Sequence, residues 1–455
     1  MTVLVVASTM YQSMSLAAAA DAGLLTGDAG EERILVLANS SQVPEVTGRL
    51  QDAPGFDLIA ARFDRVLDLA ELIYPRRPPQ FSPAHEELRM WQTLLRSHWS
   101  LGAEPVRLVL DSVHVNPGIA LARIFSEATL TVHSDGLMVY GPTRSPLGLD
   151  ISQRLDALLY LDLVPGLQPQ LLREHQITTT AIPRDALRAV IDELAAVRSG
   201  ELTNSGSRTA LILGQYLTEL RLIDRAEEAE LHRTMLETAA QLGIERCVFK
   251  PHPSAGRKAT HELAAAAAEL GIEFVVLDLA MPAEVVLALL RPDAVVGAFS
   301  TAMATARFLY GIETVAVGTE LMLERLTPYE NSNRIPVTII DAVLVRDLDA
   351  PAEASNNQEE RLQSLVNAVA YCMQPVNLAA LRPQAMDYLD AAASTDQLRY
   401  FKRRRLTALD LPGSLPASRQ AVVLARRLPP RIRHLGRRVL TRHVLGRRVL
   451  ASVTG

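Results

Sequence analysis

The sequence has little cysteine and no long hydrophobic run. Cys247 and Cys372 are the two cysteines among 455 residues, and neither has metal-ligand spacing around it. We therefore expect neither a disulfide framework nor a zinc site, and a reducing cytoplasm fits best. No apolar stretch approaches the roughly 20 residues that a membrane-spanning helix needs. Because Met1 is followed by no basic leader or cleavage site, we also expect no secretory signal.

Several sequence patterns of nucleotide-binding and repeat proteins are missing as well. No strand is followed by a Gly-x-Gly-x-x-Gly dinucleotide loop or a Walker loop, which argues against NAD enzymes and P-loop ATPases. No cluster of His, Asp and Glu suggests a metal, and we expect no cofactor. The chain shows no repeat of roughly 20 to 50 residues, so a solenoid is not expected.

Short β-branched runs alternate with longer helical patterns, which is typical of parallel sheets. At 455 residues and 48% hydrophobic, the chain exceeds what one core usually organises. The predicted strands of a first set are 2–8, 33–38, 106–111 and 128–133. Those of a second set are 208–213, 246–250, 273–277, 294–299, 314–317 and 336–340. The polar Gly/Ser segment 198–208 lies between the sets and reads as a linker.

The predicted fold is therefore α/β, with two doubly wound Rossmann-like domains facing a cleft. The predicted parts are a first domain, a second domain, returning helices and a basic tail, over residues 1–200, 206–375, 376–400 and 401–455. In such folds ligands bind in the crevice beyond the carboxyl ends of the strands. Functional side chains are therefore sought just after each predicted strand.

Charge is distributed unevenly along the chain. Net charge is −5, yet residues 401–455 hold fourteen Lys and Arg against one acid, Asp410, which leaves about −18 for residues 1–400. From 435 on, arginine pairs alternate with aliphatic residues, which favours an amphipathic basic helix on an anionic membrane surface. A polyanionic glycan or a nucleic acid would need the same charges, and a solvated tail is the simplest alternative. We expect the tail to bind the inner face of the cell membrane, and we expect no nucleic-acid partner.

A histidine stands between two prolines where a predicted strand ends. The run is Lys250, Pro251, His252 and Pro253. The prolines keep His252 out of a helix and hold it at the crevice. Its imidazole can donate a proton or a hydrogen bond to a departing phosphate oxygen, and Lys250 adds positive charge. An isolated histidine in such a place more often only caps a loop.

An acid and a glycine follow a strand of the first set. Ser134, Asp135 and Gly136 come directly after the predicted strand 128–133. A carboxylate facing the crevice could take the proton from an attacking hydroxyl. An Asp-Gly pair alone is usually a turn. The interpretation of Asp135 therefore depends on the other motifs.

Polar residues also begin two helical patterns of the second set. Ser300 and Thr301 follow the strand 294–299 and could offer hydroxyl and N–H donors to a phosphate. Glu284 opens the helical pattern after 273–277, where a carboxylate could hold ribose hydroxyls. Capping and the helix dipole explain these residue types equally well.

Taken in order, these motifs resemble those of bacterial sialyltransferases with the GT-B fold, in particular the α-2,8-polysialyltransferase-like group. The segments that carry the resemblance are Ser134-Asp135-Gly136, Lys250-Pro251-His252-Pro253, Pro282-Ala283-Glu284 and Ser300-Thr301. It covers residues 1 to about 345, including the loop after the first strand and the strand-Gly-Gln opening of the second domain. Ser134 departs from the family pattern, which more often has an acid there.

The resemblance implies an inverting, metal-independent transfer of sialic acid or a related nonulosonic acid from a CMP-activated donor, a substrate rather than a cofactor, to a hydroxyl of a cell-surface glycan. Asp135 would be the general base, and His252 would protonate or hydrogen-bond the departing phosphate. Glu284 would bind the ribose, with Ser300 and Thr301 on the phosphate. The remaining donor-side residues would be Lys250, Pro253, Gly214 and Gln215, and those on the acceptor side Thr9, Gln12 and Gly136.

Three other functions remain open at this stage. CDP-polyol phosphotransferases of the teichoic-acid type and Kdo-type transferases also place a His-Pro and a hydroxyl pair around a cytidine nucleotide. The motifs at Asp135 and Glu284 favour the sialyltransferase-like reading over both. A non-catalytic glycan-binding protein could keep the same fold, although the presence of Asp135 and His252 argues against it.

Overall fold

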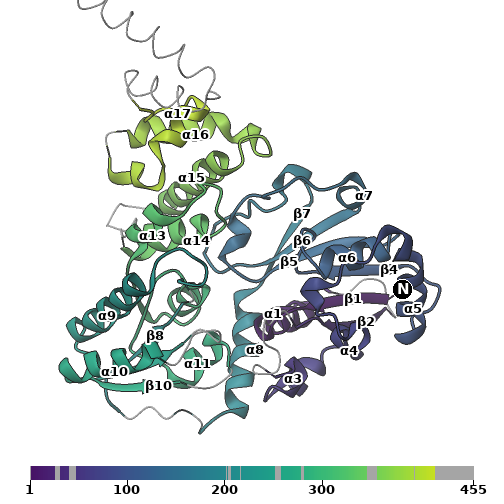
Figure 1. The fold of residues 1–455 in the computed structure, drawn as a ribbon, viewed down its shortest axis with the longest axis horizontal. Coiled ribbons are helices and arrows are strands. Elements are labelled where there is room, and N and C mark those ends of the chain that lie inside the picture. Colours follow the sequence, from purple (N-terminus) through teal and green to yellow (C-terminus); the bar gives the residue numbers. More distant parts are fainter. Residues whose placement is uncertain are drawn as a thin grey trace, which may run out of the picture.

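Two parallel β-sheets, each with its own helices, form the body of the molecule (Figure 1). The computed structural model describes residues 2–25, 31–39, 48–200, 202, 206–215, 217–251, 258–277, 281–345, 356–393 and 395–415. His252, Pro253 and the basic segment from 435 on, all singled out by sequence, lie outside these ranges.

The first sheet has seven parallel strands in the order β3-β2-β1-β4-β5-β6-β7. The strands are β1 (Thr2–Ala7), β2 (Glu32–Leu37), β3 (Arg65–Asp68), β4 (Val106–Leu110), β5 (Thr129–Ser134), β6 (Leu155–Leu161) and β7 (Thr178–Ile182). The order reverses between β1 and β4. Ligands of doubly wound sheets bind at such a reversal, beyond the carboxyl ends of the strands.

The second sheet has five parallel strands in the order β10-β9-β8-β11-β12. The strands are β8 (Thr209–Leu213), β9 (Arg246–Lys250), β10 (Glu273–Val276), β11 (Ala294–Gly297) and β12 (Glu313–Ala316). Here the order reverses between β8 and β11. All five residues of β8 are buried, as expected for a central strand with helices on both faces.

Helices cover both sheets. Those of the first half are α1 (Met10–Asp21), α3 (Phe56–Ala60), α4 (Leu69–Ile73), α5 (Leu88–His98), α6 (Gly118–Ile124), α7 (Leu149–Ser152) and α8 (Arg184–Val197). Those of the second half are α9 (Arg225–Gln241), α10 (Lys258–Glu269), α11 (Ala283–Leu290), α12 (Thr301–Ala304), α13 (Thr319–Arg325), α14 (Arg334–Ile340), α15 (Asn356–Met373), α16 (Arg382–Ala392) and α17 (Arg403–Leu409). Helix α8 packs against α1 on one side and α11 on the other, and so joins the two halves (Figure 1).

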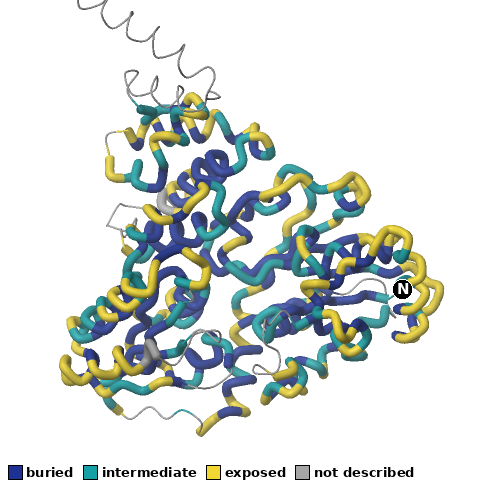
Figure 2. Tube along the Cα trace, viewed as in Figure 1, coloured by how far each residue is buried: buried dark blue, intermediate teal, exposed yellow. Residues whose placement is uncertain are grey.

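The central strands of both sheets are buried, whereas most residues of β3, β7 and β10 are partly or fully exposed (Figure 2). The predicted fold class, two doubly wound α/β units, is therefore confirmed. No helix in the described part of the chain is long and apolar enough to cross a membrane.

One predicted strand is wrong. Residues 336–340 belong to helix α14, whose seven residues are all buried. The run Val337, Thr338, Ile339, Ile340 is rich in β-branched residues and locally favours a strand. Pro336 lies in the first turn, where a proline is tolerated because the helix needs no N–H there. Packing of α14 against α13, α15 and the first domain overrides the local preference.

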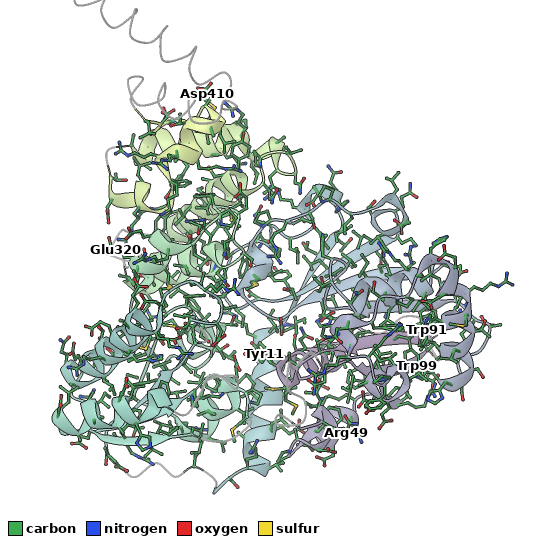
Figure 3. The ribbon with its side chains drawn as sticks, in the orientation of Figure 1. Tyr11, Arg49, Trp91, Trp99, Glu320 and Asp410 are labelled. Atoms are coloured by element: carbon green, nitrogen blue, oxygen red, sulfur yellow. The ribbon has the colours of Figure 1, made fainter. Side chains whose placement is uncertain are left out.

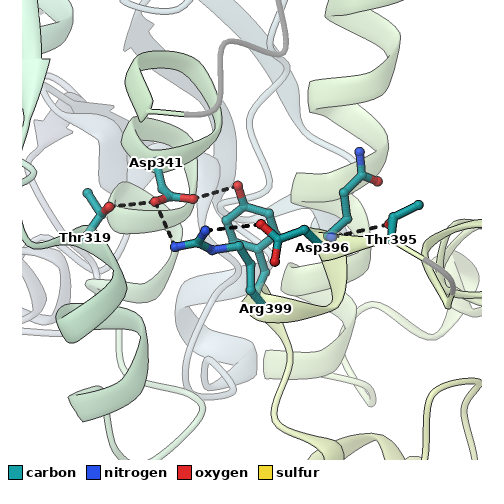
Figure 4. Close-up of polar contacts among 7 residues, drawn as sticks. Thr319, Asp341, Thr395, Asp396 and Arg399 are labelled. Carbon is teal, nitrogen blue, oxygen red and sulfur yellow. Dashed lines mark hydrogen bonds and ion pairs between the residues drawn. The ribbon is translucent and has the colours of Figure 1, made fainter.

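A buried carboxylate fastens the chain after α16 to the second domain (Figure 4). Asp341 is fully buried and accepts hydrogen bonds from the hydroxyls of Thr319, at 2.6 Å, and Tyr400, at 2.8 Å. The guanidinium of Arg399 lies 3.4 Å from the same carboxylate and 3.4 Å from the exposed Asp396. The last helices are therefore part of the packed structure up to residue 415.

Candidate functional site

The reversal point of the first sheet holds a network of polar side chains. Thr9 caps α1, its Oγ1 accepting a hydrogen bond from the Gln12 amide at 3.1 Å, while Gln12 Oε1 accepts from the Ser8 amide at 2.7 Å. The Ser8 hydroxyl donates to Asp111 Oδ2 at 2.8 Å and so ties the loop after β1 to the end of β4. Thr9 and Gln12, both predicted on the acceptor side, are thus engaged within their own loop.

Asp135 comes directly after β5, next to this network. The residue is half-buried, and burial raises the pKa of its carboxyl above the ordinary value. His133 on the same strand lowers that pKa, and the Asp111 carboxylate raises it. His133 is buried and its Nε2 lies 2.9 Å from the Val6 carbonyl. Asp135 is therefore a carboxylate with higher proton affinity than usual, at the sheet edge where doubly wound folds generally bind ligands.

At the reversal point of the second sheet, hydrogen bonds likewise join the loops that follow the strands. Gln215 Oε1 accepts a hydrogen bond from the Phe299 amide at 2.8 Å, which ties the loop after β8 to the loop after β11. The Gly214 amide donates to the Lys250 carbonyl at 2.9 Å. A Cβ on Gly214 would lie 2.9 Å from the Phe249 ring, so this approach requires glycine. Gly214 and Gln215 thus shape the loops that carry Lys250 and Ser300.

Ser300 and Thr301 begin α12 as predicted. The Ser300 hydroxyl accepts from the Ala302 amide at 3.3 Å and caps the helix. Thr301 reaches the other domain, where its Oγ1 lies 3.5 Å from the Leu137 amide. A Cβ on Gly136 would lie 3.2 Å from the same oxygen. The loop that carries Asp135 therefore meets the start of α12 directly.

Glu284 is a buried acid in the first turn of α11. Its exposed fraction is 6%, and burial raises the pKa of its carboxyl to about 7. Lys250 lowers this pKa, whereas the charge of Asp135 raises it. Burial also lowers the pKa of the Lys250 ammonium, and Glu284 counteracts that shift. A carboxylate of each domain therefore lies within electrostatic reach of the other.

Tyr11 and Asp111 belong to the same region, although sequence reasoning did not single them out. The Tyr11 hydroxyl is buried and has no close hydrogen-bond partner among the described residues, and Figure 3 shows Tyr11 on α1 where the first domain faces the second. Burial, then the charges of Glu284 and Asp135, raise the pKa of Tyr11 well above its ordinary value. Asp111 Oδ1 is also buried without a partner. Asp111 directly follows β4, which is the signal that could have found it, whereas Tyr11 lies within α1 and no local pattern marks it.

The structure brings five of the twelve predicted residues together, while His252 and Pro253 lie outside the described residues. Those that converge between the two sheets are Asp135, Gly136, Lys250, Glu284 and Thr301. Within the described residues, no group of three or more His, Cys, Asp and Glu could hold a metal ion. The arrangement offers one carboxylate of raised basicity, one buried acid and several hydroxyl and amide donors, which suits proton transfer and the binding of a polar ligand.

Two facing Rossmann-like domains with polar strand-end loops between them are the architecture of the GT-B class of glycosyltransferases. Residues 3–319 match the model of the alpha-2,8-polysialyltransferase family, and the chain belongs to this family. It is accordingly a glycosyltransferase of the sialyltransferase type. A comparison with curated proteins found no match.

Solved structures give weaker likenesses. The GT-B domain of a Photobacterium damselae sialyltransferase has 12% identity and a TM-score of 0.40, over 75% of this chain and 96% of that one. The Escherichia coli heptosyltransferase WaaC, with ADP-2-deoxy-2-fluoro heptose, has 15% identity and a TM-score of 0.36, over 70% and 88%. Acinetobacter baumannii MurG has 13% identity and a TM-score of 0.36, over 85% and 94%. The GT-B architecture is defined by the two doubly wound sheets themselves.

Proposed function

We propose that the protein transfers sialic acid or a related nonulosonic acid from a CMP-activated donor to a glycan hydroxyl, with inversion and without a metal. The observation that carries this proposal is the contact between Thr301 of the second domain and the loop that carries Asp135, with Glu284 within electrostatic reach of Asp135. Family membership supports the class of reaction. The donor, the stereochemistry and the metal independence are our proposal.

Asp135 is the proposed general base. The acceptor oxygen attacks the anomeric carbon of the donor sugar from the side opposite the phosphate. The bond from that carbon to the phosphate oxygen breaks, its electron pair leaves with CMP, and the hydroxyl proton passes to Asp135. Because its pKa is raised, the Asp135 carboxylate is a stronger base than an exposed aspartate.

The second domain holds the donor in this proposal. Glu284 receives the ribose hydroxyls, and Ser300 and Thr301 donate to the phosphate. Each of these two hydroxyl oxygens faces a backbone N–H, so its own proton can point toward a ligand. His252 and Lys250 offset the charge that develops on the single phosphate, and closure of the two domains excludes water.

The proposed place of action is the inner face of the cell membrane, reached through the basic tail. The start of the tail is part of the fold, since Lys402 donates to the Glu324 carbonyl at 2.9 Å and Arg405 pairs with Glu330 at 2.8 Å. Arg403 and Arg404 on α17 are exposed. The cations from Arg419 onward therefore carry most of the proposed membrane contact.

A donor panel tests the proposed reaction. Purified full-length protein is incubated with CMP-sialic acid, other CMP-nonulosonates, CMP-Kdo or CDP-glycerol, and CMP release is followed with and without EDTA. We expect turnover with a CMP-nonulosonate, unchanged by EDTA. Turnover with CDP-glycerol or CMP-Kdo alone would contradict the proposed donor.

Two substitutions test the proposed roles in the same assay. Asp135→Asn and His252→Ala should each lower kcat/KM by about 100-fold or more, because each removes a proton-transfer group. Asp57→Asn, an exposed aspartate on α3, is the matched control and should retain activity. Turnover that survives both substitutions would show that the assigned roles are wrong.

A further inference from the structure

A cavity lies between the first domain and the C-terminal helices, and its lining residues differ from those of the Asp135–Glu284 region. Its volume is about 390 Å³, within the range of ligand sites. One wall is the segment after β6, residues 168–179, and the other is formed by α15 and α16. Figure 1 shows α15 and α16 beside the end of the first sheet that carries β7. None of the residues assigned above to donor or acceptor lines it.

Five of the eleven residues that line this cavity carry side-chain amides, and three of these are linked to one another. They form a chain in which Gln363 Nε2 donates to Asn367 Oδ1 at 2.8 Å, and Asn367 Nδ2 donates to Gln384 Oε1 at 3.0 Å. Gln170 Nε2 joins the two walls by donating to Asn367 Oδ1 at 2.9 Å. These bonds fix the orientation of the Gln363, Asn367 and Gln384 amides. A pre-oriented set of amides needs little further ordering when a ligand binds.

Several hydrogen-bond donors in the cavity are not used by the linked amides. Gln384 uses its oxygen in the chain, which leaves both N–H groups of its amide for another partner. The side-chain amides of Gln168 and Gln176 have no hydrogen-bond partner in the described part of the protein, and both line the cavity. Arg173 gives one N–H to Gln170 Oε1 at 3.0 Å and keeps its others. No acidic residue lines the cavity.

The cavity is also linked to the loop that carries Asp135. The amides of Gln170 and Leu171 both donate to the Val139 carbonyl at 3.1 Å. Val139 belongs to the 3-10 turn η4 (Leu137–Tyr140), which begins directly after Asp135 and Gly136. One wall of the cavity is therefore held by the segment that presents the proposed general base.

We propose that this cavity is a carbohydrate-binding site that holds a distal, carboxylate-bearing unit of the acceptor glycan. Amide groups donate to and accept from sugar hydroxyls, Arg173 pairs with a carboxylate, and Leu171 and Ile177 offer apolar surface to a sugar ring. The choice of an acidic glycan rests on the proposed function. The site would let an extended acceptor bind at two points, which favours acceptors that already carry several acidic sugars.

Direct binding tests the site without any turnover. Full-length protein is titrated by calorimetry with oligosialic acid and, separately, with the neutral maltohexaose, both in the absence of donor. We expect the acidic oligosaccharide to bind at least tenfold more tightly. Arg173→Gln and Gln384→Leu should each raise its Kd at least tenfold, whereas Gln241→Leu, an exposed glutamine at the end of α9, should not.

Kinetics separates this site from the reaction centre. In Arg173→Gln the KM for a long acidic acceptor should rise at least fivefold, while kcat and the KM for a singly sialylated acceptor stay unchanged. Unaltered oligosialic acid binding by both pocket variants would overturn the proposal, as would equally tight binding of maltohexaose. Binding that depends on Arg173 and Gln384 without turnover of any CMP-sugar would leave the site standing and refute the proposed function instead.

Discussion

Glu284 is a buried acid whose raised pKa makes stability depend on pH. Its pKa is about 7 in the folded protein against an ordinary value of 4.5, so the folded state binds more protons between these values. The stability of the folded state is therefore unaffected by this group below about pH 4.5 and falls as pH rises toward 7. The loss is about 3 kcal/mol at pH 8, by the free energy of a pKa shift.

Replacing this acid should therefore stabilise the protein in a pH-dependent way. Glu284→Gln removes the ionisation, so its gain in free energy of unfolding over the wild type should be larger at pH 8 than at pH 5 by about 2 kcal/mol. Denaturant unfolding at both pH values measures this. Glu320→Gln, an exposed acid in the first turn of α13, is the control. An equal effect of Glu284→Gln at both pH values would contradict the raised pKa.

Within the described residues the buried Tyr11 hydroxyl has no close hydrogen-bond partner, and it lies within electrostatic reach of Glu284 and Asp135. We expect this hydroxyl to bond a substrate group, so Tyr11→Phe should lower kcat/KM about tenfold or more. Stability should change by less than about 1 kcal/mol, because the contact with the Thr305 hydroxyl is weak. Steady-state kinetics and thermal unfolding test both. Tyr74→Phe, 83% exposed, is the control. A stability loss with unchanged kinetics would assign Tyr11 a packing role only.

How far sequence predicts individual site residues depends on whether the signal is local. Asp135, Glu284 and Thr301 follow strands, so the strand-end rule selected them. Tyr11 differs because its importance comes from Asp135 and Glu284, which lie more than 100 residues away along the chain. The contact between Thr301 and the Leu137 amide is equally non-local. No local pattern contains such proximities.

Among elements, the strands found from sequence include the central strands β1, β4, β8 and β11, which are mostly apolar and buried and whose predicted bounds agree closely with the observed ones. The edge strand β10 is also predicted, although none of its four residues is buried. The three missed strands, β3, β6 and β7, are polar or partly exposed. Four of the five residues of β7 are not buried, because it is an edge strand. The prediction for residues 336–340 fails in the opposite way: a strand is expected, but tertiary packing makes this β-branched run part of helix α14.

The fastening of η9 (Asp396–Tyr400) to the second domain gives an element-scale prediction. Asp341→Asn removes the buried anionic partner of Arg399 and leaves this arginine, 11% exposed, only the exposed Asp396 as an anionic partner among the described residues; loss of a buried partner typically costs about 3–5 kcal/mol. We expect a lower denaturation midpoint and faster proteolysis of the segment after α16. Asp396→Asn removes the other partner of the same arginine, and its side chain is 69% exposed, so its effect should stay below about 1 kcal/mol. Equal effects would mean that burial of Asp341 is not decisive.

At the scale of the whole molecule, the folded body is acidic and most of the basic residues of the tail follow it along the chain. Residues 1–400 carry about −18, and the cations that follow lie mainly beyond the described structure. Phe401, Leu406 and Leu411 are buried, so the chain to residue 415 belongs to the fold. A cut at residue 400 would therefore damage the fold as well as remove charge. Substitutions within the full chain are the cleaner test of membrane binding.

Replacing an arginine pair in the tail should weaken binding to anionic vesicles. Arg437→Glu with Arg438→Glu removes two contributions of about 1 kcal/mol each. The affinity for phosphatidylserine-containing vesicles, measured by sedimentation, should therefore fall about 30-fold. Arg76→Glu with Arg89→Glu changes the net charge equally at exposed sites on the body and should have little effect. Pure phosphatidylcholine vesicles should bind none of these proteins. Equal weakening by both pairs would indicate a net-charge effect, and unchanged binding by the tail variant would refute membrane contact through this segment.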